Sequence, residues 1–216
     1  SLFFEYIANL LYVLFIRKLS THRLALLVFA MAGALLGYAL TNESGTLGAG
    51  WTFANGGFWG GMLRMMFAFP AGLLLSRVSC KCNIRGAFWW CAMAIAAVAM
   101  APRIGGEGQL WANGLYEALC VLVVFPLMVW LGASGQTTDA LSTRVCNFLG
   151  NISYPLYLTH FPLLYTCFAY AKRNNMPFCE TLPQILALIF ACIALAWLCL
   201  RYYDVPVRRW LQRRLA

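Results

Sequence analysis

Residues 149–165 read LGNISYPLYLTHFPLLY, a mostly apolar stretch that contains several groups which hydrocarbon cannot hydrogen-bond. These polar side chains are Asn151, Ser153, Tyr154, Tyr157, Thr159 and His160. Pro155 and Pro162 bracket the histidine. Because a proline lacks the backbone N–H and disfavours helix just before itself, we predict a broken entry followed by a helix. The stretch therefore predicts a membrane-embedded segment whose polar side chains line a cavity.

The composition of the whole chain places it in a membrane. Of its 216 residues, 62% are hydrophobic and 11% are charged, whereas about a quarter of the residues in soluble domains are charged. The net charge of +9 does not indicate a nucleic-acid partner, because the basic residues are spaced between apolar runs and form no continuous basic face with interleaved aromatics. We predict an all-α, polytopic transmembrane helical bundle in a lipid bilayer.

Seven apolar segments predict about seven spans. They are expected near residues 2–16, 24–40, 58–75, 86–101, 114–132, 148–170 and 183–203. Every Lys and Arg except Arg64, Arg103, Lys172 and Arg173 then falls on the side that receives Arg17, which predicts a multi-pass protein with a cytoplasmic C-terminus. We expect residues 1–216 to form a single membrane-embedded domain. Because an apolar run is under way from the second residue, we also expect it to be the C-terminal part of a longer chain.

Three ionisable side chains within the predicted spans are candidate catalytic residues: Glu5, Arg64 and His160. A charge at the bilayer centre costs at least about 2.5–3.5 kcal/mol, so such groups usually face a bundle interior or a water-filled pocket. Each has a simpler interpretation. Glu5 would contact water at the outer interface, Arg64 would extend to an interface marked by Trp59, and His160 would bridge two helices. The polar residues close to His160 in the sequence, with Tyr157 one turn away, favour a site that holds a sugar or an acyl group.

The run LGNISYPLYLTHFPL resembles the C-terminal signature of the membrane acyltransferase-3 family, LGxISYxLYLxHxP. The opening SLFFEYIANLLYVL is similar to the family's SLxxE element through Ser1, Leu2 and Glu5. The run RMMFAFPAGLLLSR, which begins at Arg64, resembles the family's stretch of an arginine followed by Phe, Gly and Leu, and YYDVPVRRWL is similar to its closing pattern through Asp204. The resemblance extends over essentially the whole chain, in family order.

This resemblance implies an integral enzyme of the bacterial inner (plasma) membrane. Such an enzyme moves an acyl group, commonly acetyl from acetyl-CoA, to a hydroxyl of a cell-surface polysaccharide or glycolipid. The donor would be acetyl-CoA or another acyl-CoA, and no permanently bound cofactor or metal is expected. The family's first helices, with an arginine and the histidine regarded as its catalytic base, are absent from this chain.

Roles for the candidate residues follow from the resemblance and their chemistry. Glu5 would orient or charge-balance the upstream base, and Arg64 would hold donor phosphate or developing negative charge. His160 would line the acceptor path or support its pocket. The expected substrate-binding residues are Ser1, Asn151, Ser153, Tyr154 and Tyr157.

Two other classes stay open on the residues alone. A transporter or flippase for a small polar or lipid-linked substrate would also use helices broken at Pro155 and Pro162, although the two halves of the chain show no internal symmetry. A purely structural membrane subunit would tolerate replacement of Arg64 and His160.

Overall fold

A computed structural model describes residues 2–42, 45–48, 57–79, 82–102, 109–137, 139–174 and 176–215. Ser1 and Arg103, used above, lie outside these ranges. Backbone contacts divide the chain into two compact units, Ser1–Thr137 and Thr138–Ala216, and each is described by itself. The single domain over residues 1–216 stays a prediction.

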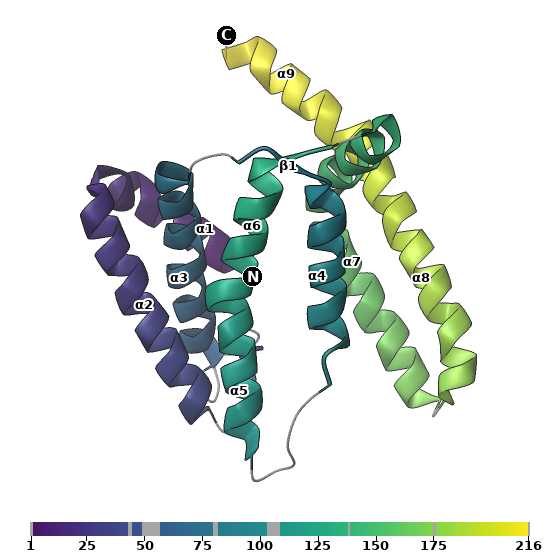
Figure 1. Cartoon of the computed structure of the whole chain (residues 1–216). Helices are drawn as coiled ribbons and strands as arrows, with labels where there is room; N and C mark the ends of the chain where they lie inside the picture. The colour runs from purple at the N-terminus through teal and green to yellow at the C-terminus, as the bar shows by residue number, and fades with distance from the viewer. Residues whose placement is uncertain are drawn as a thin grey trace. The chain divides into compact units, whose positions relative to one another are not determined.

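The first unit is built from helices and a two-residue strand pair. Its elements are α1 (Leu2–Leu14), the 3-10 helix η1 (Ile16–Lys18), α2 (Thr21–Thr41), α3 (Gly57–Val78), β1 (Ile84–Arg85), α4 (Ala87–Met100), α5 (Leu110–Leu119), the π-helical η3 (Cys120–Val124), α6 (Phe125–Ser134) and β2 (Gly135–Gln136). Helix α2 packs against α3 and α5, α1 packs against α3, and α4 packs against α6 (Figure 1). Strands β1 and β2 pair in parallel.

The core of the first unit lies where α2, α3 and α5 meet. Its buried cluster includes Leu35, Ala39, Leu47, Phe67 and Ala118. Leu47 belongs to none of the helices, because it lies in the short segment after α2. Non-helical backbone inside a membrane bundle is tolerated only where protein buries it. The burial of Leu47 by these helices therefore fixes the position of the segment that contains it.

The second unit is a helical hairpin with a C-terminal extension. It contains α7 (Ala140–Arg173), α8 (Phe178–Cys199), the π-helical η4 (Leu200–Asp204) and α9 (Val205–Leu215). Helices α7 and α8 pack along each other (Figure 1). The Asp139 carboxylate caps α7 by accepting the Ser142 N–H at 2.8 Å.

The predicted break at Pro155 and Pro162 is wrong, because α7 runs through both prolines without interruption. Each proline removes one N–H donor from a 34-residue helix, and the rest of the ladder holds it together. Threonine hydroxyls add local bonds, such as the one that Thr159 Oγ1 donates to the Pro155 carbonyl at 2.9 Å. The carbonyls that lose an N–H partner are those of Asn151 and Leu158, four residues before each proline, so the threonine bond adds to the helix without replacing the lost bonds.

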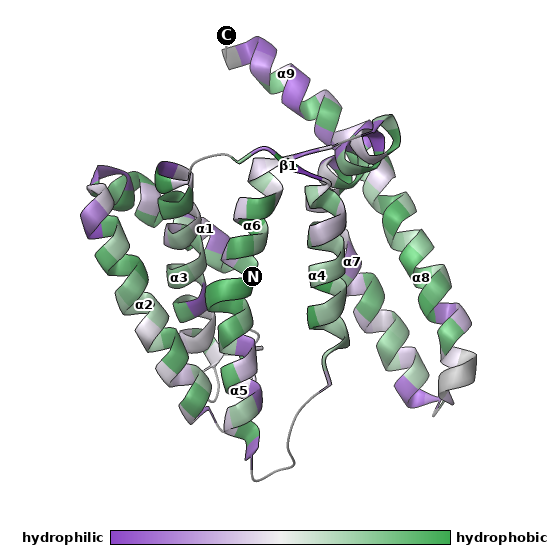
Figure 2. Cartoon of the chain, in the orientation of Figure 1, coloured by the Kyte–Doolittle hydropathy of each residue, from purple (hydrophilic) through white to green (hydrophobic). Residues whose placement is uncertain are grey.

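All seven apolar segments coincide with helical structure, which confirms the all-α class. Among the described residues, four stretches are long and apolar enough to cross a membrane: Thr21–Thr41, Gly57–Val78, Leu110–Ser134 and Thr181–Arg214. Two shorter apolar helices are Phe3–Leu14 and Ala87–Met100. Figure 2 shows apolar residues along the bodies of these helices and hydrophilic residues in α9. The chain is a multi-pass membrane protein, while the number of seven spans and the orientation stay predictions.

Both π-helical segments are followed closely by a proline. In η3 the Phe125 N–H bonds to the Cys120 carbonyl, and in η4 the Val205 N–H bonds to the Leu200 carbonyl. A proline follows each of these donors, at positions 126 and 206. Because a proline ring clashes with the carbonyl four residues earlier, a wider turn at this point relieves the clash. The same two helices carry the acidic residues Glu117 and Asp204 next to or within their π turns.

Candidate functional site

Arg64 is bound to the segment that follows α2. Its Nη1 donates to the Leu47 carbonyl oxygen at 2.9 Å. Arg64 lies seven residues after the start of α3, about 10 Å along the helix, and Leu47 is only 2% exposed. A guanidinium has five N–H donors, and this bond uses one of them. The predicted role of Arg64 toward a donor phosphate stays a prediction.

Glu117, on α5, binds the same segment and was not found by sequence reasoning. Its carboxylate accepts the Leu47 N–H at 2.6 Å and the Thr46 hydroxyl, whose oxygen lies 3.0 Å from both carboxylate oxygens. The Thr46 carbonyl accepts the Asn42 amide at 2.7 Å, and the Thr46 hydroxyl oxygen accepts the Gly48 N–H at 3.1 Å. An acidic residue inside the span predicted for residues 114–132 was the available signal, since such groups are costly there unless they are paired.

Glu5 lies on the exposed side of α1. The Asn9 side-chain amide donates to the Glu5 backbone carbonyl at 2.9 Å, so Asn9 does not engage the carboxylate through this bond. Within the described ranges, no ion pair joins Glu5 to Arg64. The rings of Phe4 and Phe58, 5.6 Å apart between centroids, pack α1 against α3. The predicted role of Glu5 stays a prediction, and Ser1 lies outside the described residues.

His160 is anchored to its own helix in the second unit. Its Nδ1 lies 2.9 Å from the Leu156 carbonyl oxygen and 3.0 Å from the Tyr157 carbonyl oxygen. Because a carbonyl only accepts, these contacts select the tautomer with the hydrogen on Nδ1, in which Nε2 has the lone pair. The Tyr157 and Phe161 rings lie 6.2 and 6.4 Å from the imidazole centroid. The half-buried imidazole therefore presents a proton acceptor beside two aromatic rings.

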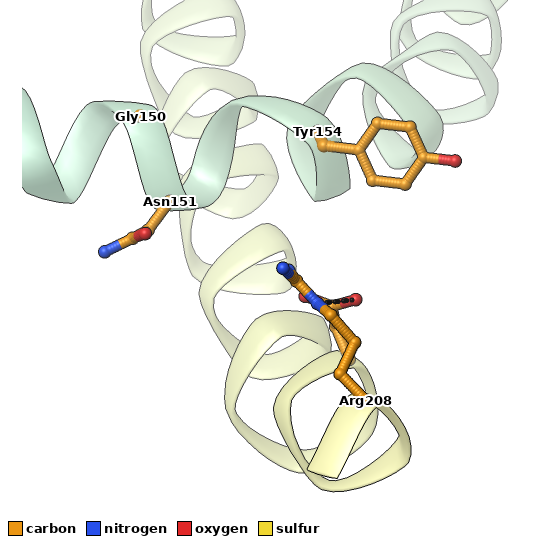
Figure 3. Close-up of a pocket in the computed structure, with 5 residues that line it drawn as sticks. Gly150, Asn151, Tyr154 and Arg208 are labelled. Atoms are coloured by element: carbon orange, nitrogen blue, oxygen red, sulfur yellow. Dashed lines mark hydrogen bonds and ion pairs between the residues drawn. The ribbon is translucent and has the colours of Figure 1, made fainter. Parts of the chain in front are cut away.

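A pocket of about 460 Å³ lies at the end of the α7–α8 hairpin that is opposite the turn between the two helices. It is lined by Gly150, Asn151, Tyr154, Asp204 and Arg208. Figure 3 shows Asn151 on α7 and Arg208 on α9, with the arginine joined to the Asp204 carboxylate. Arg208 Nε donates to Asp204 Oδ1 at 3.0 Å, and Nη2 donates to Oδ2.

The pocket gathers some of the predicted substrate-binding residues and not others. Asn151 and Tyr154 line it, whereas Ser153 and Tyr157 are not among its lining residues. The Ser153 hydroxyl donates to the Gly150 carbonyl at 2.8 Å, within its own helix. Sequence reasoning noted Asp204 only as part of a closing motif. Its spacing of four residues from Arg208 was the signal for an ion pair across one helical turn.

The pocket and His160 lie at different depths along the hairpin. At 1.5 Å per residue, His160 is about 21 Å along α7 from the turn at Asn174, whereas Asn151 is about 34 Å from it. Asp204 lies about 40 Å along the second arm from Pro177. A bilayer core is about 30 Å thick. His160 and Asn151 are therefore separated by about 13 Å along α7, less than half of that thickness.

Among the described residues, no group of three or more His, Cys, Asp or Glu is placed to hold a metal ion.

A family model described as an acyltransferase domain matches residues 1–201. The comparisons found no matching curated protein and no matching solved structure.

Proposed function

Because the chain belongs to the acyltransferase-3 family, we propose that it transfers an acetyl group from acetyl-CoA to a hydroxyl of a cell-surface polysaccharide or glycolipid. The family and the apolar helices make it a multi-pass membrane acyltransferase. The donor, the acyl group, the acceptor and a bacterial inner-membrane location with a cytoplasmic C-terminus are the proposal. The observation that carries it is the family match over residues 1–201.

The resemblance implied another histidine as the base and placed His160 along the acceptor path; we propose instead that His160 takes the proton of the acceptor hydroxyl. In the tautomer with the hydrogen on Nδ1, Nε2 has the lone pair that can accept a proton. The acceptor oxygen attacks the thioester carbonyl, and an ester C–O bond forms. As the tetrahedral intermediate collapses, the C–S bond breaks and the thiolate leaves. The imidazolium returns its proton to that thiolate, so the products are the ester and coenzyme A.

Arg64 is proposed to bind negative charge on the donor side of the reaction. It is a cation in an apolar helix, and a guanidinium suits phosphate oxygens and a developing oxyanion. Glu5 on α1 is proposed to balance positive charge in the first unit. For the acceptor, Asn151 and Tyr154 are proposed to hydrogen-bond its sugar, with Ser153 and Tyr157 on the same helix, because sugar recognition needs a few well-placed polar groups among apolar ones.

The test follows label from [1-14C]acetyl-CoA into glycan in membranes from cells that express the complete gene. We expect His160→Ala to lower transfer by about 10²–10⁴-fold, the usual contribution of a general base. His22→Ala is the matched control, because His22 is exposed in the first turn of α2 and should leave transfer unchanged. Unlabelled glycan with the unaltered protein would overturn the proposal, and substrate uptake in its place would indicate a transporter. Full activity of His160→Ala would remove His160 from the mechanism.

The transporter alternative has lost its main structural support. It relied on helices interrupted at Pro155 and Pro162, and α7 is continuous through both. We therefore keep one candidate function.

A further inference from the structure

We propose that Glu117 is a positioning residue for Arg64. Its carboxylate holds Thr46 and Leu47, and the Leu47 carbonyl in turn holds the guanidinium. This inference rests on the proposed function, because it gives Glu117 a catalytic consequence through the donor-side role of Arg64.

Leu47 is held through both of its backbone polar groups. Its N–H donates to Glu117 at 2.6 Å, and its carbonyl accepts from Arg64 at 2.9 Å. The residue is buried among apolar side chains of α2, α3 and α5. A buried backbone group left without a partner costs about 1–3 kcal/mol. Moving either side chain away therefore carries that cost, which ties the two positions together.

The two charges are opposite in sign and lie at similar distances from the start of their helices. Glu117 lies seven residues after the start of α5, and Arg64 lies seven residues after the start of α3, so each is about 10 Å along its helix. The Leu47 N–H points its positive end at the carboxylate, and the Leu47 carbonyl points its negative end at the guanidinium. Hydrogen bonds in such a chain polarise one another. The acidic and basic groups are thus coupled through one residue without touching.

The segment between them is held at several further points. The Asn42 amide and the Gly48 N–H both bond to Thr46. Gly45 has a φ of +57°, and a Cβ added there would lie 2.7 Å from the Leu110 carbonyl oxygen. A support restrained at so many points holds a functional side chain in one geometry, which is what preorganisation requires.

Two conservative variants separate positioning from folding. Thr46→Val removes the hydroxyl and keeps the shape. Glu117→Gln keeps an acceptor for the Leu47 N–H and removes the charge. Thr41→Val is the matched control, because the Thr41 hydroxyl bonds to carbonyls of its own helix at Gly37 and Tyr38.

The first measurement is kcat and KM for acetyl-CoA at a fixed amount of membrane glycan. We expect Thr46→Val and Glu117→Gln to lower kcat/KM by about 10- to 100-fold, because a misplacement of about 1 Å costs up to that much. Thr41→Val should behave like the unaltered protein. In an Arg64→Ala background, Glu117→Gln should cause no further loss, since a residue that acts through Arg64 has nothing left to position. Additive losses, or unchanged kinetics in both variants, would refute the inference.

The second measurement does not depend on activity. Phenylglyoxal modifies accessible guanidinium groups, and mass spectrometry of the purified protein follows the peptide that contains Arg64. We expect several-fold faster modification of Arg64 in Thr46→Val and Glu117→Gln, and no change in Thr41→Val. If these variants release Arg64 but the unaltered protein transfers no acetyl group, the proposed function fails and the positioning of Arg64 stands. If transfer is measured and Arg64 reacts equally in all proteins, the positioning inference fails and the function stands.

Discussion

Gly114 lies at a close approach between α2 and α5, and Gly114→Ala tests this contact directly. An added Cβ would lie 2.1 Å from the Ala39 carbonyl oxygen and 3.0 Å from its carbonyl carbon. Carbon and oxygen normally approach to about 3.3 Å, so the helices would have to separate by about 1.2 Å. The atoms in the way are backbone atoms, which no rotamer change can move.

The expected loss of stability follows from this displacement. Overpacking typically costs about 1–3 kcal/mol, and we take about 3 kcal/mol because the obstacle is backbone. Alanine recovers about 1 kcal/mol through its higher helix propensity. The net loss of about 2 kcal/mol lowers Tm by about 4–8 °C in a chain of this size.

The assay is thermal unfolding of the purified protein in detergent, followed by circular dichroism at 222 nm. Gly33→Ala is the matched control, because Gly33 lies on α2 and a Cβ added there meets nothing within 4 Å. The control should melt at the temperature of the unaltered protein or slightly above it. If Gly114→Ala melts at or above the temperature of Gly33→Ala, the close contact between α2 and α5 is not present in the folded protein.

Three further changes test local features by the same unfolding assay. Gly45→Ala should lower Tm by several degrees, because φ is +57° and the Leu110 backbone lies against the new Cβ; an unchanged Tm would contradict the geometry of this turn. Asp204→Ala should change the unfolding free energy by less than about 1 kcal/mol, since its partner Arg208 is 62% exposed; a larger loss would mean that the ion pair is shielded from water. Pro206→Ala should raise stability by about 1–2 kcal/mol, because an exposed proline is replaced inside a continuous helix; a lower Tm would argue that the π turn is stabilising.

Much of the fold was predictable because membrane helices follow local composition. An apolar run of span length must satisfy its backbone hydrogen bonds internally, and a helix does so within one segment. The segments predicted at 24–40 and 58–75 therefore appear as α2 and α3 with similar bounds. The prediction at Pro155 and Pro162 failed because proline preferences are local averages, and a helix of 34 residues packed along a neighbour tolerates two lost donors.

The candidate site divides in the same way. His160 and Asn151 could be named as candidates because polar groups in an apolar run are visible within a few residues of sequence. Glu117 was missed because its partners, Thr46 and Leu47, lie about seventy residues earlier in the chain. No periodicity or spacing connects positions so far apart.

By itself, the amino-acid sequence determined the membrane environment, the helical class and the family. Hydropathy and a continuous motif depend only on which residues follow one another. The tertiary structure alone decided which distant groups Glu117 and Arg64 bind. It brought Glu117 and Arg64 onto the two backbone groups of Leu47, and it placed Asn151 and Arg208 in the lining of one pocket. These arrangements arise from helix packing, which brings together residues that are distant along the chain and that no local pattern connects.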